Sequence, residues 1–505
     1  MQNDWKPKLG DKFYRPSRLS YTRLRRTLGI PALFSAGYGN VGSSIYYGLG
    51  VVALAALGFA PIALLIAGII YIFNSLSYAE GSSMIPEGGG SASFARVAFN
   101  DMAGFISGWA LMLSYIATIA ISAYTIPPYL SHFWPVLREP YANTLLSMLI
   151  ILFLMFLNVI GIRESSRVNI LFTVVDILTQ LCLIVLGVAF IIAVNPSVLL
   201  NNMFGQGNIP SPQSFILGIA LAALCFTGVE TVSQLAEETK RPTWRIPRTY
   251  ILMIFVVLLM FAGISVVALG AMTPQMLGDP VNGWARDPVA GIAANLPFPI
   301  LRDLFEPLVA VLAASILLTA TNAGLLGISR LSFSMARHRQ IPLSMARVHK
   351  RFRTPYISIL FFCAMVFLLM IPGFYSPGFF VDLGGLYVFG SLLCFALAHL
   401  AILGLRLFRT DLPRPFKVGW NIKLKGRELP VTALLGLIST VLVWLLIIFT
   451  QEFSRNIGLI WMVLGLVLYI GYRIKAKLPI FSIPRKGALS TTEADRETAK
   501  KQVEG

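Results

Sequence analysis

Charged residues are scarce in this chain. Of its 505 residues, 13% are Asp, Glu, Lys or Arg, whereas 56% are hydrophobic, and the mean hydropathy is +0.73. A soluble protein of this length needs far more polar surface, so the composition excludes that class. The sequence instead predicts an all-α membrane protein that crosses the bilayer many times.

Several chemical signatures are missing as well. The four cysteines stand singly in apolar runs, a pattern that fits neither zinc-ligand spacing nor a disulfide framework. No run places a nucleophile beside a base or gathers metal ligands, and no G-x-x-x-x-G-K-[ST] phosphate loop occurs. The polar N-terminus lacks the short apolar core of a removable signal peptide. We therefore expect no enzyme, no metal site and no cofactor.

Acidic residues are outnumbered, and the net charge is +18. About twelve apolar runs reach the roughly 20 residues that span a bilayer. All but four of the 41 Lys and Arg residues lie on alternate connections between these runs, the exceptions being Arg138, Arg286, Arg302 and Arg455. This asymmetry is the positive-inside pattern. It predicts a cytoplasmic N-terminal segment (1–30), a transmembrane domain (31–475) and a cytoplasmic tail (476–505) in the inner or plasma membrane. Topology and anionic lipid thus explain the basic charge, and nucleic acid is not an expected partner.

Glycine interrupts the first apolar run, where GYGNVG (37–42) matches the G-x-G-x-x-G of a dinucleotide-binding turn. That interpretation fails because no strand precedes the stretch and no carboxylate follows before Glu80. The sixth run is interrupted in turn by the polar sequence TGVETVS (227–233). Interrupted helices that lead two halves of a transporter point to a solute site near the bilayer midplane. We therefore expect broken first and sixth helices rather than glycines that only allow close packing.

Five ordered motifs resemble the amino acid–polyamine–organocation superfamily of permeases. They are YAEGSSMIPEGGGSASFARVAF (78–99), LNVIGIRESSRVN (157–169), FTGVETVSQLAEETKRPTWRIPR (226–248), SRLSFSMARHRQIP (329–342) and LPRPFKV (412–418). The resemblance implies two inverted five-helix repeats followed by two C-terminal helices. It also implies a secondary transporter that moves a small solute by alternating access.

The solute has two interpretations. The motifs at 226–248 and 412–418 resemble the amino acid branches, which implies uptake of an amino acid or related amine with H⁺ or Na⁺. YGNVGSSIYY (38–47) instead resembles the Y-G-D-I-G-T-S-P-L-Y of potassium uptake permeases, with Asn40 replacing their aspartate. The alternative is therefore a potassium or other cation permease. The sequence leaves the oligomeric state open.

The resemblance assigns the site residues. For an amino acid, Gly42, Ser43 and Ser44 would offer amides and hydroxyls to its carboxylate, and carbonyls near Phe226 to Gly228, with Glu230, would meet its ammonium. The full set of candidate substrate residues is Tyr38, Asn40, Gly42, Ser43, Ser44, Tyr115, Phe226, Thr227, Gly228 and Glu230. Trp109 is a weaker candidate for the wall of the same cavity.

Carboxylates within spanning runs are functional hypotheses by default. Asp176 occupies the fifth-helix position at which many proton-coupled relatives carry a lysine, so we expect it to couple transport to an ion. Thr319, Thr321 and Asn322 of the eighth helix are its expected helpers, and plain packing of Asp176 is the alternative. Outside the site, we expect a surface or gate ion pair from Glu237 or Glu238 to Lys240 or Arg241. We expect His399 to be a hydrogen-bonded packing residue and Asp382 to lie near water at the outer end of the tenth helix.

Overall fold

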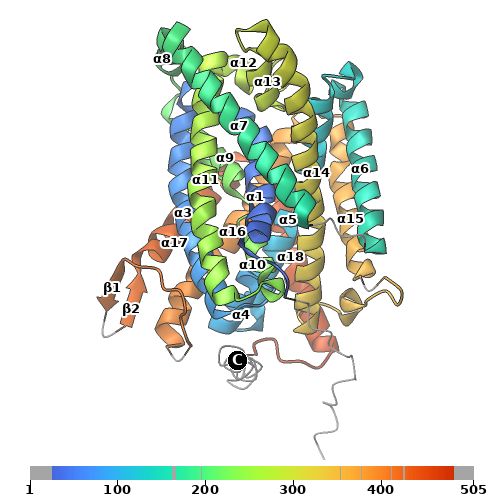
Figure 1. The fold of residues 1–505 in the computed structure, drawn as a ribbon. Coiled ribbons are helices and arrows are strands. Elements are labelled where there is room, and N and C mark those ends of the chain that lie inside the picture. The colour runs from blue at the N-terminus through green and yellow to red at the C-terminus, as the bar shows by residue number, and fades with distance from the viewer. Residues whose placement is uncertain are drawn as a thin grey trace, which may run out of the picture.

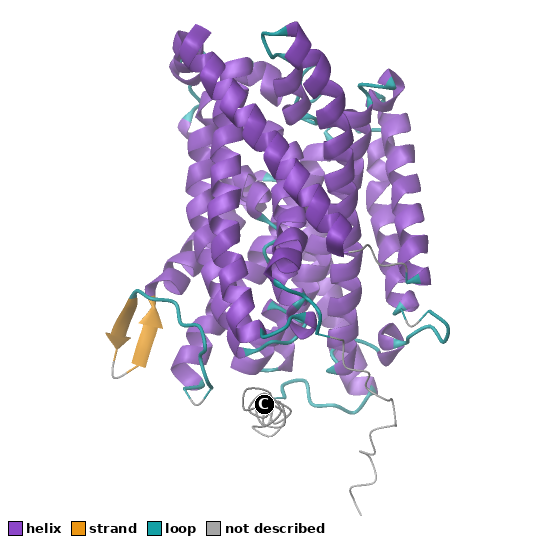
Figure 2. Cartoon of the chain, in the orientation of Figure 1, coloured by secondary structure: helices purple, strands orange, loops and turns teal. Residues whose placement is uncertain are grey.

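The computed structural model describes residues 26–161, 166–194, 196–352, 354–376, 378–410, 412–424 and 427–482. In this part of the chain nearly all of the ordered structure is helical, and the helices form one upright bundle (Figures 1 and 2). Most of the predicted N-terminal segment (1–30) and tail (476–505), and part of the motif at 157–169, lie outside the described residues.

The helices are α1 (Ile30–Val41), α2 (Ile45–Ala56), α3 (Ala60–Met84), α4 (Ser91–Ala98), α5 (Asp101–Leu130), α6 (Pro140–Ile160), α7 (Ser166–Val194), α8 (Pro196–Phe204), α9 (Pro212–Ala222), α10 (Glu230–Gln234), α11 (Pro242–Ala271), α12 (Pro274–Gly278), α13 (Pro288–Ala294), α14 (Pro299–Arg337), α15 (Tyr356–Met370), α16 (Phe379–Phe408), α17 (Val431–Thr450) and α18 (Glu452–Lys475). The 3₁₀ turns are η1 (Gly42–Ser44), η2 (Leu57–Phe59), η3 (Pro135–Arg138), η4 (Ala223–Phe226), η5 (Ala236–Glu238), η6 (Leu343–Ala346) and η7 (Ile371–Phe374), and the strands are β1 (Asn421–Leu424) and β2 (Arg427–Pro430).

Proline in the first turn starts many of these helices, α6, α11 and α14 among them, because that position needs no backbone N–H donor. Eleven described segments are long and apolar enough to cross a membrane. The first of them, Ile30–Met84, turns back at η2, where Leu57 has a φ of 47°, so it supplies two crossings. The all-α membrane fold and its predicted twelve spans are therefore confirmed.

The two ends of the bundle differ. Figure 1 shows α8, α12 and α13 at the upper end, and α4 and the β1–β2 hairpin at the lower end. The hairpin is antiparallel, with Asn421 opposite Pro430. Residues that precede α1 also lie at the lower end, because the amides of Thr27 and Leu28 donate to the carbonyl of Glu238 in η5. The upper end would be the outer one in the topology that the charges predict.

The sixth spanning segment is broken as expected. The chain runs through α9 and η4, leaves helical geometry at Thr227 (φ −80°, ψ 161°) and Gly228 (φ 95°), and resumes as α10. The first spanning segment differs from the expectation. Gly42 keeps right-handed helical angles (φ −65°, ψ −33°) and its amide donates to the carbonyl of Tyr38, so the helix only tightens into η1 between α1 and α2.

The glycines of the first segment serve close packing to a greater extent than we expected. A Cβ on Gly37 would approach Met253 of α11 to 2.6 Å, and one on Gly48 or Gly50 would collide with Cys225 or with the backbone of Ala285. Neighbouring elements thus pack directly against this backbone. Small residues allow membrane helices to approach in this way, and that role replaces unwinding as the main reason for the glycines.

Candidate substrate and ion site

The continuous first segment and the broken sixth segment meet at Asn40. Its side-chain amide donates to Thr231 Oγ1 over 2.7 Å. The positive φ of Gly228 brings its backbone against the same side chain, since a Cβ there would lie 2.8 Å from Asn40 Cγ. Asn40 Oδ1 itself has no hydrogen-bond partner among the described residues. At the break in the sixth segment, the side-chain NH₂ of Asn40 is therefore hydrogen-bonded, whereas its side-chain carbonyl oxygen accepts no bond from the described residues.

Glu230 begins α10 directly after the break, and its side chain is fully buried. Within the described part of the chain no other side chain donates to either carboxylate oxygen, and the nearby donors are the backbone amides of Gly228 and of Glu230 itself. A buried carboxylate without partners is costly, and structures normally satisfy such a group. Glu230 and Asn40 Oδ1 are thus two buried acceptors at the same break, and each could be satisfied by a cationic or donor-rich group.

Tyrosines surround this carboxylate. Tyr78, Tyr115 and Tyr250 lie within electrostatic range of it, and all three are fully buried. The Tyr250 hydroxyl donates to the carbonyl of Val229 over 3.1 Å, beside the break. The Tyr115 hydroxyl has no partner among the described residues, and its ring packs against Gly327 of α14. The structure thus places Tyr115 near Glu230.

The predicted carboxylate cradle is already occupied by internal bonds. Ser43 Oγ donates to the carbonyl of Asn40 over 3.0 Å, and Ser44 Oγ lies 2.9 Å from the hydroxyl of Tyr47. With the Gly42 amide bound to Tyr38, the cradle would need local rearrangement before it could hold a carboxylate. Thr227 Oγ1 likewise donates to the carbonyl of Leu224 over 2.7 Å.

The rings of two aromatic candidates, Phe226 and Trp109, pack against other helices. The ring of Phe226 packs between Tyr71 of α3 and Phe261 of α11, at centroid distances of 5.3 and 5.2 Å. Trp109 stacks on Trp461 of α18 at 4.5 Å and donates to that residue's carbonyl. Both rings therefore serve helix packing, as apolar aromatics in a membrane bundle usually do.

Asp176 of α7 forms a second polar cluster, in which both of its oxygens accept hydrogen bonds. Tyr38 Oη donates to Oδ2 over 3.1 Å, Gln180 Nε2 donates to the same oxygen over 2.8 Å, and Tyr46 Oη donates to Oδ1. Because Tyr38 lies on α1 and Tyr46 on α2, the carboxylate joins the two halves of the first segment across η1. Sequence reasoning missed Tyr46 and Gln180, although Gln180 lies one helical turn from Asp176.

In the described part of the chain, no hydrogen bond joins the expected helpers from α14 to Asp176. Thr319 and Thr321 each donate to a carbonyl of their own helix, and Asn322 accepts a bond of 2.6 Å from Asn158 of α6. Thr319 does face the first segment, since its methyl carbon lies 3.6 Å from where a Cβ of Gly39 would be. The described side chains that bond to Asp176 are Tyr38, Tyr46 and Gln180 rather than these three.

The remaining predictions concern groups outside the site. Glu238 pairs with Arg330 of α14 at 2.8 Å, so the expected ion pair is present but with another cation than the neighbouring Lys240 or Arg241, and Glu237 accepts the amide of Gly88. His399 lies 2.8 Å from both Ser77 and Asn74, which confirms a hydrogen-bonded packing role. Asp382 is partly exposed in the first turn of α16.

A twelve-span bundle with a broken segment and two buried carboxylate clusters defines a multi-pass membrane transporter. The sequence model of the amino acid permease family matches residues 28–470. The chain therefore belongs to the amino acid permease family, within the superfamily that its motifs resemble.

The curated relatives differ in the solutes for which they are named. A branched-chain amino acid permease of Bacillus subtilis (strain 168), BcaP, is 28% identical over 90% of this chain and 94% of its own length. The glutamate/serine transporter AimA of the same organism is 25% identical over 90% of this chain and 83% of its own. A methylthioribose transporter, also from that organism, is 28% identical over 78% and 84%.

Proposed function

We propose that this protein is a secondary transporter that moves amino acids across the membrane by alternating access. The observation that carries the proposal is the unpaired acceptor cluster at the break of the sixth segment. Glu230 and Asn40 Oδ1 are buried there without a side-chain donor from the described residues. The ammonium of an amino acid supplies three donors and a positive charge, and so satisfies both groups at once. Two of the relatives described above are named for amino acids.

The second part of the proposal concerns coupling. Asp176 bonds to both halves of the first segment, so a change of its charge alters contacts on either side of η1. A proton or Na⁺ at this carboxylate would compete with the tyrosine donors and shift the balance between conformations. This links an ion gradient to the movement of the first segment. The geometry favours Asp176 over the threonines of α14 for this role.

The test is charge movement on proteoliposomes adsorbed to a solid-supported membrane. Mixed amino acids are applied first and K⁺ or Rb⁺ second, each at two pH values. We expect currents with amino acids that change with pH, and little or no current with K⁺ alone. The Glu230→Gln variant, which removes the charge but not the volume, should lose the amino acid currents. Currents with K⁺ alone would instead make Glu230, Asn40 and Ser43 part of a cation site and refute amino acid transport.

A further inference from the structure

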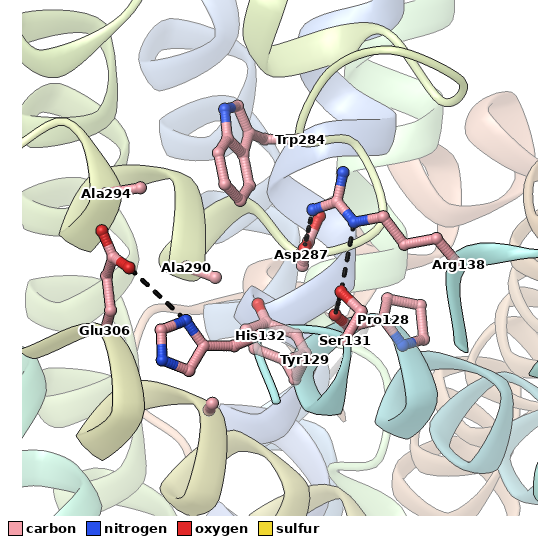
Figure 3. A pocket seen from close by; sticks show the side chains of 11 residues that line it. Pro128, Tyr129, Ser131, His132, Arg138, Trp284, Asp287, Ala290, Ala294 and Glu306 are labelled. Carbon is pink, nitrogen blue, oxygen red and sulfur yellow. Dashed lines mark hydrogen bonds and ion pairs between the residues drawn. The ribbon is translucent and has the colours of Figure 1, made fainter. Parts of the chain in front are cut away.

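A cavity of about 140 Å³ opens at the upper end of the bundle, away from the Glu230 cluster. A single water needs only roughly 10–15 Å³ on this measure, so the cavity admits a small organic solute. It is enclosed by the end of α5, the start of α14, α13 and the connection before α13 (Figure 3). Its polar and aromatic lining consists of Tyr129, Ser131, His132, Arg138, Trp284, Asp287 and Glu306.

A pair of ionisable side chains stands on each side of this outer cavity. Figure 3 shows Glu306 with His132 on one side and Arg138 with Asp287 on the other, with Trp284 between them at the top of the view. His132 Nδ1 lies 3.4 Å from Glu306 Oε2, and Arg138 Nη2 lies 2.6 Å from Asp287 Oδ2. A solute with one charge at each end would meet the carboxylate of Glu306 on one side and, on the other, the guanidinium of Arg138, which it would share with Asp287.

The two sides also have spare bonding capacity. Glu306 is held loosely, because Arg302 Nε is 3.9 Å away and His132 is beyond ordinary hydrogen-bond length. Arg138 uses Nε for Ser131 and Nη2 for Asp287, which leaves Nη1 without an acceptor among the described residues. A carboxylate of Glu306 is a partner for an ammonium group, and an arginine N–H is a partner for a carboxylate.

Tyr129 separates this cavity from the interior. Its ring lines the cavity, and its hydroxyl donates to the backbone carbonyl of Tyr46 over 2.7 Å. The side chain of Tyr46 in turn donates to Asp176. Tyr129 therefore links a solute in the outer cavity to Tyr46, which belongs to the Asp176 cluster proposed to couple transport.

We propose that the outer cavity is a second binding site for a zwitterionic amino acid, with the ammonium at Glu306 and the carboxylate at Arg138. This inference rests on the proposed function, since it takes the transported solute to be an amino acid. A solute bound here waits above Tyr129 until the contacts of Tyr129 and Asp287 open. The site is distinct from the Glu230 cluster, which lies at the break of the sixth segment.

A cysteine in the lining tests the proposal by solute protection. Ala290 lines the cavity, and Asn282 is an exposed residue of the preceding connection that does not line it. Ala290→Cys and Asn282→Cys are each made in a Cys182→Ser background, because Cys182 is the exposed native cysteine and the other three are buried. Intact cells are treated with a membrane-impermeant thiol reagent, with and without the common amino acids, first mixed and then singly.

We expect at least one amino acid to slow the labelling of Ala290→Cys and to leave Asn282→Cys unaffected. Adding Glu306→Gln or Arg138→Lys should raise the half-protecting concentration by about tenfold, the effect of losing one charge-assisted bond. Adding Glu230→Gln should leave that concentration unchanged. Arg138→Lys keeps a charge for Asp287, so it spares the ion pair while it removes the guanidinium.

Two results would overturn the second site. One is labelling of Ala290→Cys that no amino acid slows. The other is protection that disappears with Glu230→Gln but is indifferent to Glu306→Gln, which would place the solute in the interior alone. Uptake of labelled amino acids by the same cells is a separate measurement, and its absence would refute the proposed function whatever the pattern of protection.

Discussion

A carboxylate within a spanning helix must be paired, neutral or in use, because the surrounding medium does not solvate its charge. The three side-chain donors around Asp176 satisfy it without a cation. Asn at this position keeps the size and one acceptor but cannot exchange a proton or change charge. We expect Asp176→Asn to abolish gradient-driven accumulation while it spares exchange of external for internal solute. Uptake of a labelled amino acid into proteoliposomes, with and without an imposed gradient, measures both.

The matched control for Asp176→Asn is Thr321→Ala. Thr321 was a candidate helper, but its hydroxyl bonds only to the carbonyl of Leu317. Its removal should leave accumulation close to that of the unmodified protein. Normal accumulation by Asp176→Asn would show that Asp176 is a packing residue, and loss of accumulation by Thr321→Ala would return α14 to the coupling site.

At the residue scale, the sequence identifies the charged members of the site and misses their partners. Asp176 and Glu230 stand out because a carboxylate in an apolar run is visible without any structure. Tyr46 lies 130 positions from Asp176, and it is one of 17 tyrosines in the chain. Nothing in the sequence around Tyr46 indicates which carboxylate it contacts. Such contacts depend on how helices cross, and periodicity within one helix does not contain that information.

The break in the sixth segment makes an element-scale prediction. Gly228 combines a φ of 95° with close contact to Asn40, where a Cβ would lie 2.8 Å from Cγ. Gly207 has a φ of 81° but nothing within 4 Å of its Cβ position. Gly207→Ala should therefore cost only backbone strain, whereas Gly228→Ala should cost about 1–3 kcal/mol more through overpacking. Thermal unfolding in detergent compares the two variants, and equal losses would show that the Asn40 contact is unimportant.

The first segment shows why an element can differ from its local pattern. Its glycines suggested an unwound stretch, yet the helix continues because neighbours fill the space that side chains would need. Gly37 faces Met253 and Gly48 faces Cys225, both from segments far along the chain. Several glycines in a helix indicate that other atoms can approach its backbone closely. Only the tertiary structure determines whether those atoms belong to a solute or to neighbouring helices. In the sixth segment the mixed Thr, Gly and Glu left no such ambiguity.

A buried ion pair joins elements at the lower end and carries the next prediction. Arg406 of α16 donates twice to Glu80 of α3, over 2.7 and 2.5 Å, and the amide of Val418 donates to the same carboxylate. Removal of one partner of a buried pair leaves a charge uncompensated and typically costs about 3–5 kcal/mol. We expect Glu80→Gln to lower the free energy of unfolding by that order, measured by thermal unfolding in detergent.

The control for that pair is the exposed one between Arg455 and Glu452, whose closest atoms are 3.8 Å apart. Surface pairs contribute about 0–1 kcal/mol, so Glu452→Gln should be nearly neutral. Replacing both buried partners with leucine should recover much of the loss, because no lone charge remains. Similar effects of Glu80→Gln and Glu452→Gln would contradict a structural role for the buried pair.

For the whole molecule, hydropathy was sufficient to predict the class and the number of spans. Length and apolar content determine whether a run crosses a membrane, and neither depends on tertiary contacts. The outer cavity was not predicted, because it is assembled from α5, α13 and α14 and from connections with no apolar period. Two of the four arginines that depart from the charge asymmetry, Arg138 and Arg286, lie beside it. The sequence shows that these two arginines depart from the charge asymmetry, but only the structure shows that they lie beside a cavity.

The closure of the upper end should respond to pH through Asp287, which lies between spans. Burial raises the pKa of its carboxyl to about 6, although the guanidinium groups of Arg138 and Arg286 favour the ionised form. At about pH 7.5 the carboxylate is ionised and pairs with Arg138, whereas at about pH 5 it is largely protonated and the ion pair is lost. This pKa lies above that of an Asp in the unfolded chain, so protonation of Asp287 at low pH stabilises the folded protein. Weaker closure of the upper end in acid would therefore not result from unfolding caused by Asp287.

Labelling of Ala290→Cys relative to Asn282→Cys in intact cells measures this closure, since the ratio cancels the pH dependence of the thiol reaction itself. We expect the ratio to rise as the pH falls through about 6, where Asp287 takes up its proton. Asp287→Asn should give the high ratio at every pH, because it cannot form the ion pair. His132→Gln should keep the pH step, since His132 pairs with Glu306 on the other side of the cavity. A ratio that is flat in the unmodified sequence, or a step that survives Asp287→Asn, would show that another contact closes the upper end.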